Sequence, residues 1–164
     1  MALIHEKLYQ SDNLAQIKFA DYVQQLADEL LQSFKAAHSQ IRMVVEVTDV
    51  RLTVDTAIPC GLIINELVVN ALKYAFPQGQ TGEICIRFVS DPASSSPDNH
   101  RYILSVKDNG VGIPDQIDYS NTESLGLQIV CILTQKLEGT IHLSRTNGTE
   151  FNIVVPLLDK LHQS

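Results

Sequence analysis

The stretch from Pro59 to Pro77, PCGLIINELVVNALKYAFP, constrains the fold most, because its residue types separate into two sides when it is drawn as a helix. Steps of three and four residues place Glu66, Asn70, Lys73 and Tyr74 along one stripe. Apolar or small residues lie on or near the other side, namely Ile64, Leu67, Val68, Ala71 and Ala75. The sequence therefore predicts a helix that packs on one side and offers polar groups on the other.

The polar stripe suits a magnesium nucleotide, because it aligns a carboxylate, an amide oxygen, an ammonium and a phenol. Asn70 offers a metal ion an oxygen ligand without adding negative charge beside phosphates. Lys73 can offset phosphate charge and Tyr74 can cover a base or ribose, although a solvated lysine and a half-buried tyrosine are the structural alternatives. Asn65 points about 100° away from Glu66, which favours a structural role for Asn65.

Two later segments contain glycines where a ligand needs close approach to the backbone: DNGVGIP at 108–114 and SLGLQIV at 124–130. Asp108 ends a predicted strand and can accept a hydrogen bond from an exocyclic amine. Gly110 and Gly112 let the chain turn sharply after it. Gly126, followed by Leu127, opens a predicted helix whose first amide groups suit phosphate.

These segments, with N-E-L-V-x-N-A-L-K-Y before them and G-T-E-F after them, resemble the ATP-binding catalytic domain of sensor histidine kinases. That domain belongs to the GHKL superfamily and has the Bergerat fold. The resemblance covers roughly residues 20–158. The Asn-Glu pair in the first motif, with Ala-Phe-Pro at 75–77, resembles the motif of a histidine-kinase subgroup that is common in bacteria and archaea. It implies ATP and Mg²⁺ as cofactors and a protein-histidine kinase as the enzyme.

The resemblance also implies roles for individual residues. Asn70 matches the metal-binding asparagine, Asp108 the aspartate that selects adenine, and Thr149 a threonine that reaches adenine, although Thr149 is equally an ordinary strand threonine. Glu66 matches the carboxylate that activates water in related ATPases, and we expect it to orient the metal or its waters or to aid the incoming imidazole. Ser124 replaces a usual glycine, which predicts a looser phosphate grip. The predicted cofactor-binding residues are Asn70, Lys73, Tyr74, Asp108, Gly110, Gly112, Ile113, Gly126, Leu127 and Thr149.

The remaining patterns predict an α/β two-layer sandwich with a mixed sheet on one side and helices on the other. Asp55 or Thr56 is expected to cap the long helix, with Pro59 in its first turn. The irregular segment 113–122 is interpreted as a lid over the nucleotide. The other predicted elements are a helix over 19–37, strands over 41–48, 51–54, 83–90 and 101–108, a helix over 124–137, and a hairpin of 139–145 with 149–155 around Asn147-Gly148.

The N-terminal tract 1–10 resembles the end of a dimerisation helix, which predicts a boundary between 1–18 and a catalytic domain over 19–158, with 159–164 as a tail. The phosphate-accepting histidine would then lie outside this chain, which suggests a fragment. His5 is the alternative acceptor, but it lacks the acidic and basic neighbours of acceptors in the family. Histidine-bearing dimerisation helices, in cis or in trans, and a response regulator are the expected partners.

Composition excludes several other classes. The 164 residues carry a formal charge of −7 and a pI near 5.1, which argues against nucleic acid as a partner. No signal-peptide pattern and no apolar run of bilayer-spanning length is apparent, so a cytoplasmic location without direct membrane contact is expected. Cys60, Cys85 and Cys131 are widely spaced, and a structural metal is not expected. An anti-sigma-type serine/threonine kinase, a GHKL ATPase and a regulatory ATP-binding module remain the alternative functions.

Overall fold

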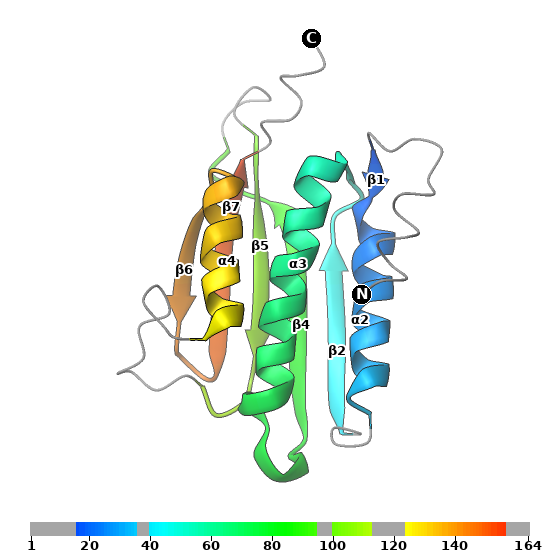
Figure 1. Ribbon diagram of the computed structural model, residues 1–164, viewed down its shortest axis with the longest axis vertical. Coiled ribbons are helices and arrows are strands. Elements are labelled where there is room, and N and C mark those ends of the chain that lie inside the picture. Colours follow the sequence, from blue (N-terminus) through cyan, green and yellow to red (C-terminus); the bar gives the residue numbers. More distant parts are fainter. Residues whose placement is uncertain (1–15, 36–39, 95–99, 113–123, 157–164) are drawn as a thin grey trace.

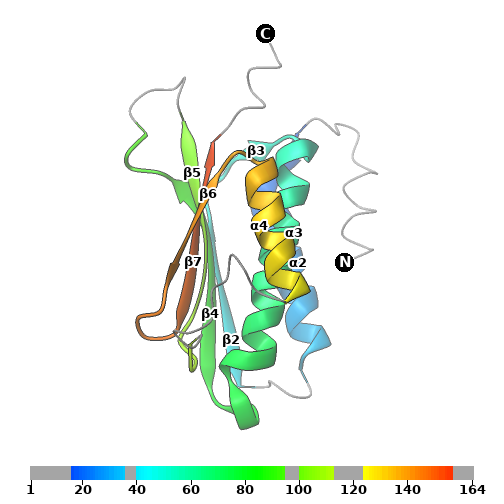
Figure 2. The same ribbon diagram turned by 60° about the vertical axis from the view of Figure 1, so that its left-hand side comes forward.

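The computed structural model describes residues 16–35, 40–94, 100–112 and 124–156, which form two layers. One layer is a five-stranded sheet, and the other consists of helices that cover only one face of it (Figures 1 and 2). The helices are α2 (Phe19–Ser33), α3 (Val54–Asn70) and α4 (Leu125–Lys136). The predicted α/β two-layer sandwich is confirmed.

The sheet has the strand order β2-β4-β5-β7-β6, and only its first pair is parallel. The remaining neighbours pair antiparallel, so the predicted mixed sheet is present. A separate two-stranded ribbon pairs β1 with β3. The strands are β1 (Ile17–Lys18), β2 (Ile41–Val47), β3 (Arg51–Leu52), β4 (Gly82–Ser90), β5 (Arg101–Asp108), β6 (Thr140–Ser144) and β7 (Thr149–Pro156).

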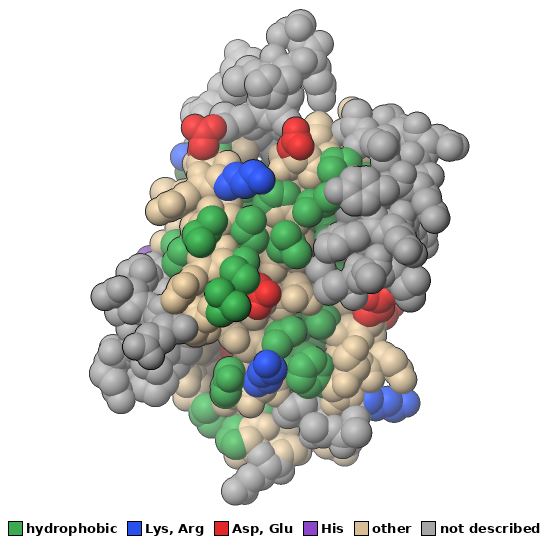
Figure 3. Space-filling view, in the orientation of Figure 1, with side chains coloured by type: hydrophobic (Ala, Val, Ile, Leu, Met, Phe, Trp, Pro, Cys, Tyr) green, Lys and Arg blue, Asp and Glu red, His purple; other side chains and the backbone are tan. Residues whose placement is uncertain are grey.

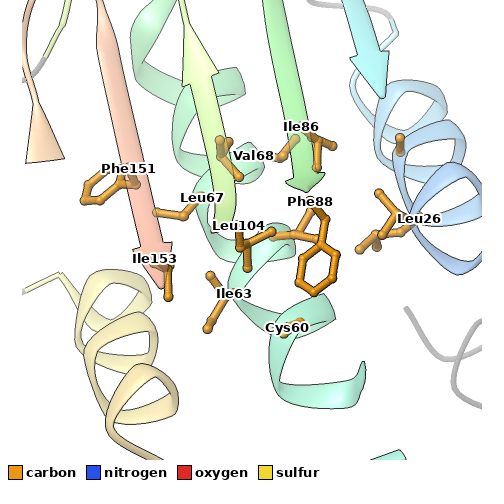
Figure 4. Packing of buried hydrophobic residues seen from close by; sticks show 14 of the residues in the cluster. Leu26, Cys60, Ile63, Leu67, Val68, Ile86, Phe88, Leu104, Phe151 and Ile153 are labelled. Carbon is orange, nitrogen blue, oxygen red and sulfur yellow. The ribbon is translucent and has the colours of Figure 1, made fainter. Parts of the chain in front are cut away.

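Strand alternation explains why helices cover one face of the sheet and leave the other open. Along β4, Ile84, Ile86 and Phe88 are fully buried, whereas the residues between them are at least partly exposed. Figure 4 shows Ile86, Phe88, Leu104 and Ile153 pointing from the sheet into the layer occupied by α3. The core therefore lies between the sheet and the helices, with α3 in its centre.

Helix α3 starts earlier than the sequence patterns predicted. Thr53 is its N-cap residue, and the Thr53 carbonyl accepts the backbone N–H groups of Thr56 and Ala57 at 3.1 and 2.8 Å. Asp55 and Thr56 therefore lie inside the helix, and so does Pro59, contrary to the predicted cap and first-turn proline. At this interior position proline removes one backbone donor, and its ring crowds the carbonyl four residues earlier, so Pro59 is unfavourable to a regular helix here.

The end of the long helix also differs from the prediction. The α-helix stops at Asn70, a π-helical turn follows over Ala71–Ala75, and a 3₁₀ turn covers Pro77–Gly79. Lys73 and Tyr74 therefore lie in a π turn and not in the regular α-helix that the prediction assumed. Both residues are exposed.

One membrane-related expectation needs correction. Val54–Ala75 forms a continuous helical segment of 22 residues that is long and apolar enough to cross a bilayer by length and composition. More than half of its most apolar part is buried inside the molecule, against the sheet. Burial of this kind is typical of the core helix of a water-soluble domain.

The other predicted elements agree with the structure to within a few residues. Helix α2 ends at Ser33, β6 ends at Ser144, and the turn residues Asn147 and Gly148 both have positive φ, as an Asn-Gly turn requires. Strand β1 was not predicted, and its Ile17 is buried in the core although it lies in the predicted linker. The predicted lid 113–122, the tail and the tract 1–10 with His5 lie outside the described residues.

Candidate functional site

A cleft of about 460 Å³ lies between the end of α3, the start of α4 and the adjoining ends of β5 and β7. Its walls are mainly apolar, with a few polar groups that converge on it, which is the usual character of a small-molecule site. Figure 3 shows the helix-covered face, where apolar side chains remain visible among polar ones. The lining residues are Leu67, Asn70, Ala71, Tyr74, Ala75, Val106, Asp108, Val111, Gly112, Ser124, Leu127, Thr149 and Phe151.

Asp108 is the buried acid of the cleft, with 6% of its surface exposed. It ends β5 directly opposite Thr149, the first residue of β7. Its carboxylate accepts the backbone N–H of Gly110 at 2.9 Å and a backbone N–H from Thr149. Burial raises the pKa of Asp108, and these two donors partly oppose the rise. The carboxylate is therefore held in one orientation at the cleft wall.

The turn after Asp108 is fixed to its neighbours through the backbone. Asn109 Oδ1 accepts the N–H of Glu83 at 2.8 Å, and the N–H of Val111 donates to the Ala75 carbonyl at 2.9 Å. Gly110 lies against the same Ala75 carbonyl, where a Cβ on Gly110 would approach the carbonyl oxygen to 2.2 Å. The sequence therefore needs glycine at 110 to join the end of the long helix to the β5 turn.

Helix α3 and the π turn that follows it contribute both wall and polar groups. Leu67, Ala71 and Ala75 are buried and form part of the apolar wall of the cleft, although their predicted role was packing alone. Asn70 lines the cleft and is half-buried. Glu66 is half-buried one turn earlier and is not among the residues that line the cleft.

The start of α4 closes the opposite side. Ser124 is its N-cap residue, and Ser124 Oγ accepts the N–H of Leu127 at 3.5 Å. The Cα of Gly126 faces α3 so closely that a Cβ there would lie 2.8 Å from Glu66 Oε2 and 3.9 Å from Asn70 Oδ1. Glu66, Asn70 and the start of α4 therefore share one small region, a cradle with the oxygen donors that Mg²⁺ prefers. These residues fit the expected metal.

The structure brings six of the predicted site residues to one cleft: Asn70, Tyr74, Asp108, Gly112, Leu127 and Thr149. Gly110 and Gly126 do not line the cleft but pack closely beside it, Gly110 against Ala75 and Gly126 against Glu66. Lys73 is exposed and does not line the cleft, and Ile113 lies outside the described residues. The sequence analysis did not identify Val106 and Phe151 as lining residues. Strand alternation could have identified them, because each lies two residues from a predicted site residue and therefore on the same face of its strand.

Within the described residues, no cluster of three or more histidine, cysteine or acidic side chains could hold a metal ion. Cys60 is buried, Cys85 and Cys131 are partly exposed, and none of these three forms a disulfide within the described residues. A magnesium ion in the cradle would thus depend on Asn70, Glu66 and the ligand's own oxygens.

The fold agrees with comparisons against known proteins. The family model of histidine kinase-, DNA gyrase B- and HSP90-like ATPases matches residues 55–159, and a second model, described as histidine kinase, matches residues 1–34. The chain therefore belongs to the histidine kinase-, DNA gyrase B- and HSP90-like ATPase family. The second match includes both the N-terminal tract and α2.

Individual relatives point to the histidine kinase branch. The chain is 34% identical over 118 residues to blue-light-activated histidine kinase 2 of Erythrobacter litoralis, an alignment that covers 71% of this chain and 32% of that protein. It is 32% identical over 108 residues to the sensor histidine kinase PdtaS of Mycobacterium tuberculosis, covering 63% and 20%.

A solved structure agrees with the sequence matches. The histidine kinase domain of an Erythrobacter litoralis blue-light-activated kinase superposes with a TM-score of 0.79 at 28% identity, covering 94% of this chain and 70% of that one. This chain is thus a histidine-kinase-type ATP-binding domain, and it spans about a third or less of the length of the curated relatives that it matches.

Proposed function

We propose that this chain binds MgATP in the cleft and transfers the γ-phosphoryl group to a histidine that lies outside it. The observation that carries the proposal is the position of Asn70 and Asp108, which come from distant parts of the sequence and line one cleft of about 460 Å³. The cleft has room for a nucleotide base within the range usual for ligand pockets.

At the base end, Asp108 acts as the acceptor for the exocyclic amine of adenine. Its orientation is set by the N–H groups of Gly110 and Thr149, so it meets the base without reorganising. Val106 and Phe151 supply apolar contact from the sheet, and Tyr74 covers the outer side of the base or ribose.

At the phosphate end, Asn70 and Glu66 would hold Mg²⁺, which when bound supplies positive charge to the phosphate oxygens. Gly126 lets the phosphates approach the first amide groups of α4, and Lys73 offsets negative charge from the exposed π turn. Catalysis then consists of positioning and charge neutralisation, because none of these residues needs to form a covalent bond with phosphate.

The expected partners follow from this reaction. The acceptor histidine would be carried by dimerisation helices in cis or in trans, and a response regulator would take the phosphoryl group next. A cytoplasmic location, where ATP is available, belongs to the same proposal. A serine/threonine kinase of the anti-sigma type, a GHKL ATPase and a regulatory ATP-binding module use a similar cleft without a histidine acceptor.

The test is phosphoryl transfer from labelled ATP. The chain is incubated with a separately prepared histidine-bearing helical hairpin, with Asp108→Asn and Asn70→Ala as binding variants and Lys107→Gln as the matched surface control. We expect acid-labile, alkali-stable label on the hairpin with the wild-type chain and with Lys107→Gln, and a loss of at least about tenfold with the other two.

Each rival gives a different result. Alkali-labile, acid-stable label on a protein acceptor would indicate a serine/threonine kinase. Steady release of phosphate that falls sharply in Glu66→Gln would indicate an ATPase, since that substitution removes the only proton acceptor proposed for water. Binding of an ATP analogue without transfer to any hairpin tested would favour the regulatory module and contradict the proposed reaction.

A further inference from the structure

Gly126 lies where a side chain would collide with Glu66. A Cβ on Gly126 would approach Glu66 Oε2 to 2.8 Å and Glu66 Cδ to 3.8 Å, while Asn70 Oδ1 would be 3.9 Å away. The contact joins the second residue of α4 to two side chains one turn apart on α3, and the two helices lie side by side in Figures 1 and 2. The Glu66 carboxylate thus occupies the space that the glycine leaves open.

The contact also brings opposite charges together, because the Glu66 carboxylate lies near the positive N-terminal end of α4. Helix α4 has no acidic residue in its first turn, so its positive N-terminal end has no anionic partner of its own in that turn. Glu66, reaching across from α3, brings a carboxylate to that end. A phosphate at the start of α4 would therefore meet a carboxylate already beside it, and the two negative charges would repel unless a cation lies between them.

We propose that Gly126 is a positioning residue for Glu66, because its missing side chain gives the carboxylate a defined place beside Asn70 at the start of α4. The inference rests on the proposed MgATP function and deepens it. It assigns to this glycine a task beyond phosphate approach: a methyl group at 126 moves the flexible end of Glu66 while leaving the backbone of α4 in place. Alanine also favours a helix over glycine, so the substituted chain should fold.

The test is a double-mutant cycle of four chains: wild type, Gly126→Ala, Glu66→Ala and the double variant. Calorimetry measures the affinity for a non-hydrolysable ATP analogue with excess Mg²⁺ and with a chelator, and the ratio of the two affinities gives the magnesium enhancement. We expect Gly126→Ala to lower the enhancement about tenfold, as for other residues that orient a metal ligand. In the Glu66→Ala background the same substitution should change it by less than about twofold.

Two controls make the result specific. Gln135→Ala, on the exposed last turn of α4, should leave the enhancement unchanged. The melting temperature of Gly126→Ala should equal or exceed that of the wild type, because the one close contact among the described residues is with a movable carboxylate.

Equal loss in both backgrounds overturns the inference, since the methyl group would then obstruct phosphate directly and Glu66 would have no part in the effect. A melting temperature that falls equally in Gly126→Ala and in the double variant also overturns it, because the collision would then be with something other than Glu66. If the wild-type chain binds no nucleotide, both this inference and the proposed function are wrong. If the wild-type chain binds the nucleotide but the effects of Gly126→Ala and Glu66→Ala on the magnesium enhancement are additive, this inference is wrong and the proposed function still stands.

Discussion

The two faces of the main sheet carry hollows of nearly equal volume, about 460 Å³ under the helices and about 450 Å³ on the open face, and Asp108 lines both. The open-face hollow is formed by residues of β2, β4, β5 and β7 and by the β5 turn. Its lining residues are Glu46, Glu83, Cys85, Arg87, Ser105, Lys107, Asp108, Asn109 and Glu150. The two hollows differ in wall chemistry rather than in size.

On the open face, two ion pairs and a side-chain hydrogen bond are present among the described residues. Arg87 Nε lies 3.0 Å from Glu46 Oε2, Arg42 lies 3.1 Å from Glu83, and the Ser105 hydroxyl donates to Asn152. Such pairs stay hydrated and leave few directed groups for a ligand. In the helix-covered cleft, a buried carboxylate and a half-buried amide face apolar walls, so a ligand gains both area and hydrogen bonds.

The strongest test of this comparison uses adjacent residues of β4 on opposite faces. Phe88 is fully buried, stacks on Tyr102 at 4.8 Å and meets Phe19 edge-on at 4.7 Å. Phe88→Ala should lower the free energy of unfolding by about 3–5 kcal/mol, since it leaves a cavity. Val89→Ala, on the half-exposed open face, should cost less than about 1.5 kcal/mol. Urea unfolding with unchanged m-values measures both, and similar losses would show that the open face is also packed.

The next test separates the faces at the site itself. Asp108→Asn should weaken binding of an ATP analogue about ten- to a hundredfold, because a hydrogen bond to a charged acceptor contributes about 1.5–3 kcal/mol. Lys107→Gln changes the neighbouring outward residue and should leave the dissociation constant within about twofold. Calorimetry on both variants gives the comparison. Equal weakening would place the ligand on the open face.

The raised pKa of Asp108 adds a pH dependence. The carboxyl group becomes protonated, and stops acting as a pure acceptor, at a higher pH than its ordinary value of 3.8. Nucleotide affinity should therefore fall as the pH is lowered through that raised pKa, and the Asp108→Asn variant should lack this step. A step identical in both chains would assign the titration to another group.

Folding stability should respond to Asp108 in the opposite sense. The folded chain holds the proton more tightly than the unfolded chain, so the stability that Asp108 contributes is complete below pH 3.8 and is lost as the pH rises through the raised pKa. Urea titrations of wild type and Asp108→Asn across this range measure the difference. A difference that grows in favour of the wild type as the pH rises would contradict the assignment.

The smallest effect is expected on the open face. Arg87 and Glu46 have side chains that are 47% and 55% exposed, so Arg87→Gln should cost less than about 1 kcal/mol and less still at high salt. Nucleotide affinity should not change. A loss of affinity comparable to that of Asp108→Asn would mean that the two faces are coupled through the β5 turn.

Elements of the fold that depend on local sequence patterns were predicted more accurately than those that depend on contacts between distant residues. Strands β4 and β5 were predicted nearly to the residue, because alternation is a local property of each strand. The start of α3 was missed because local rules favour proline in a first turn, whereas Pro59 lies inside the helix. The π turn over Ala71–Ala75 was not predicted, because helical periodicity alone does not distinguish it from an α turn, and it takes Lys73 and Tyr74 out of the predicted α-helix.

The site was predictable to the extent that motifs mark it. Asn70, Asp108 and Thr149 were identified as candidates from residue type and motif, and the structure assembles them in one cleft. Their roles stay predictions. Leu67 and Ala71 line the cleft, although they lie on the side of the helix that was expected only to pack. Their place depends on where the sheet lies relative to α3, and helical periodicity gives no information about that.

By itself, the sequence determined the order of helices and strands, the one-sided apolar patterning that makes a two-layer fold, and the residue types available for nucleotide chemistry. These depend on neighbours within a few positions along the chain. Only the tertiary structure decided that Thr149 holds Asp108, that Ala75 receives the turn at Gly110, and that Gly126 leaves room for Glu66. Those contacts join residues that are dozens of positions apart, and their geometry is set by how the elements pack together.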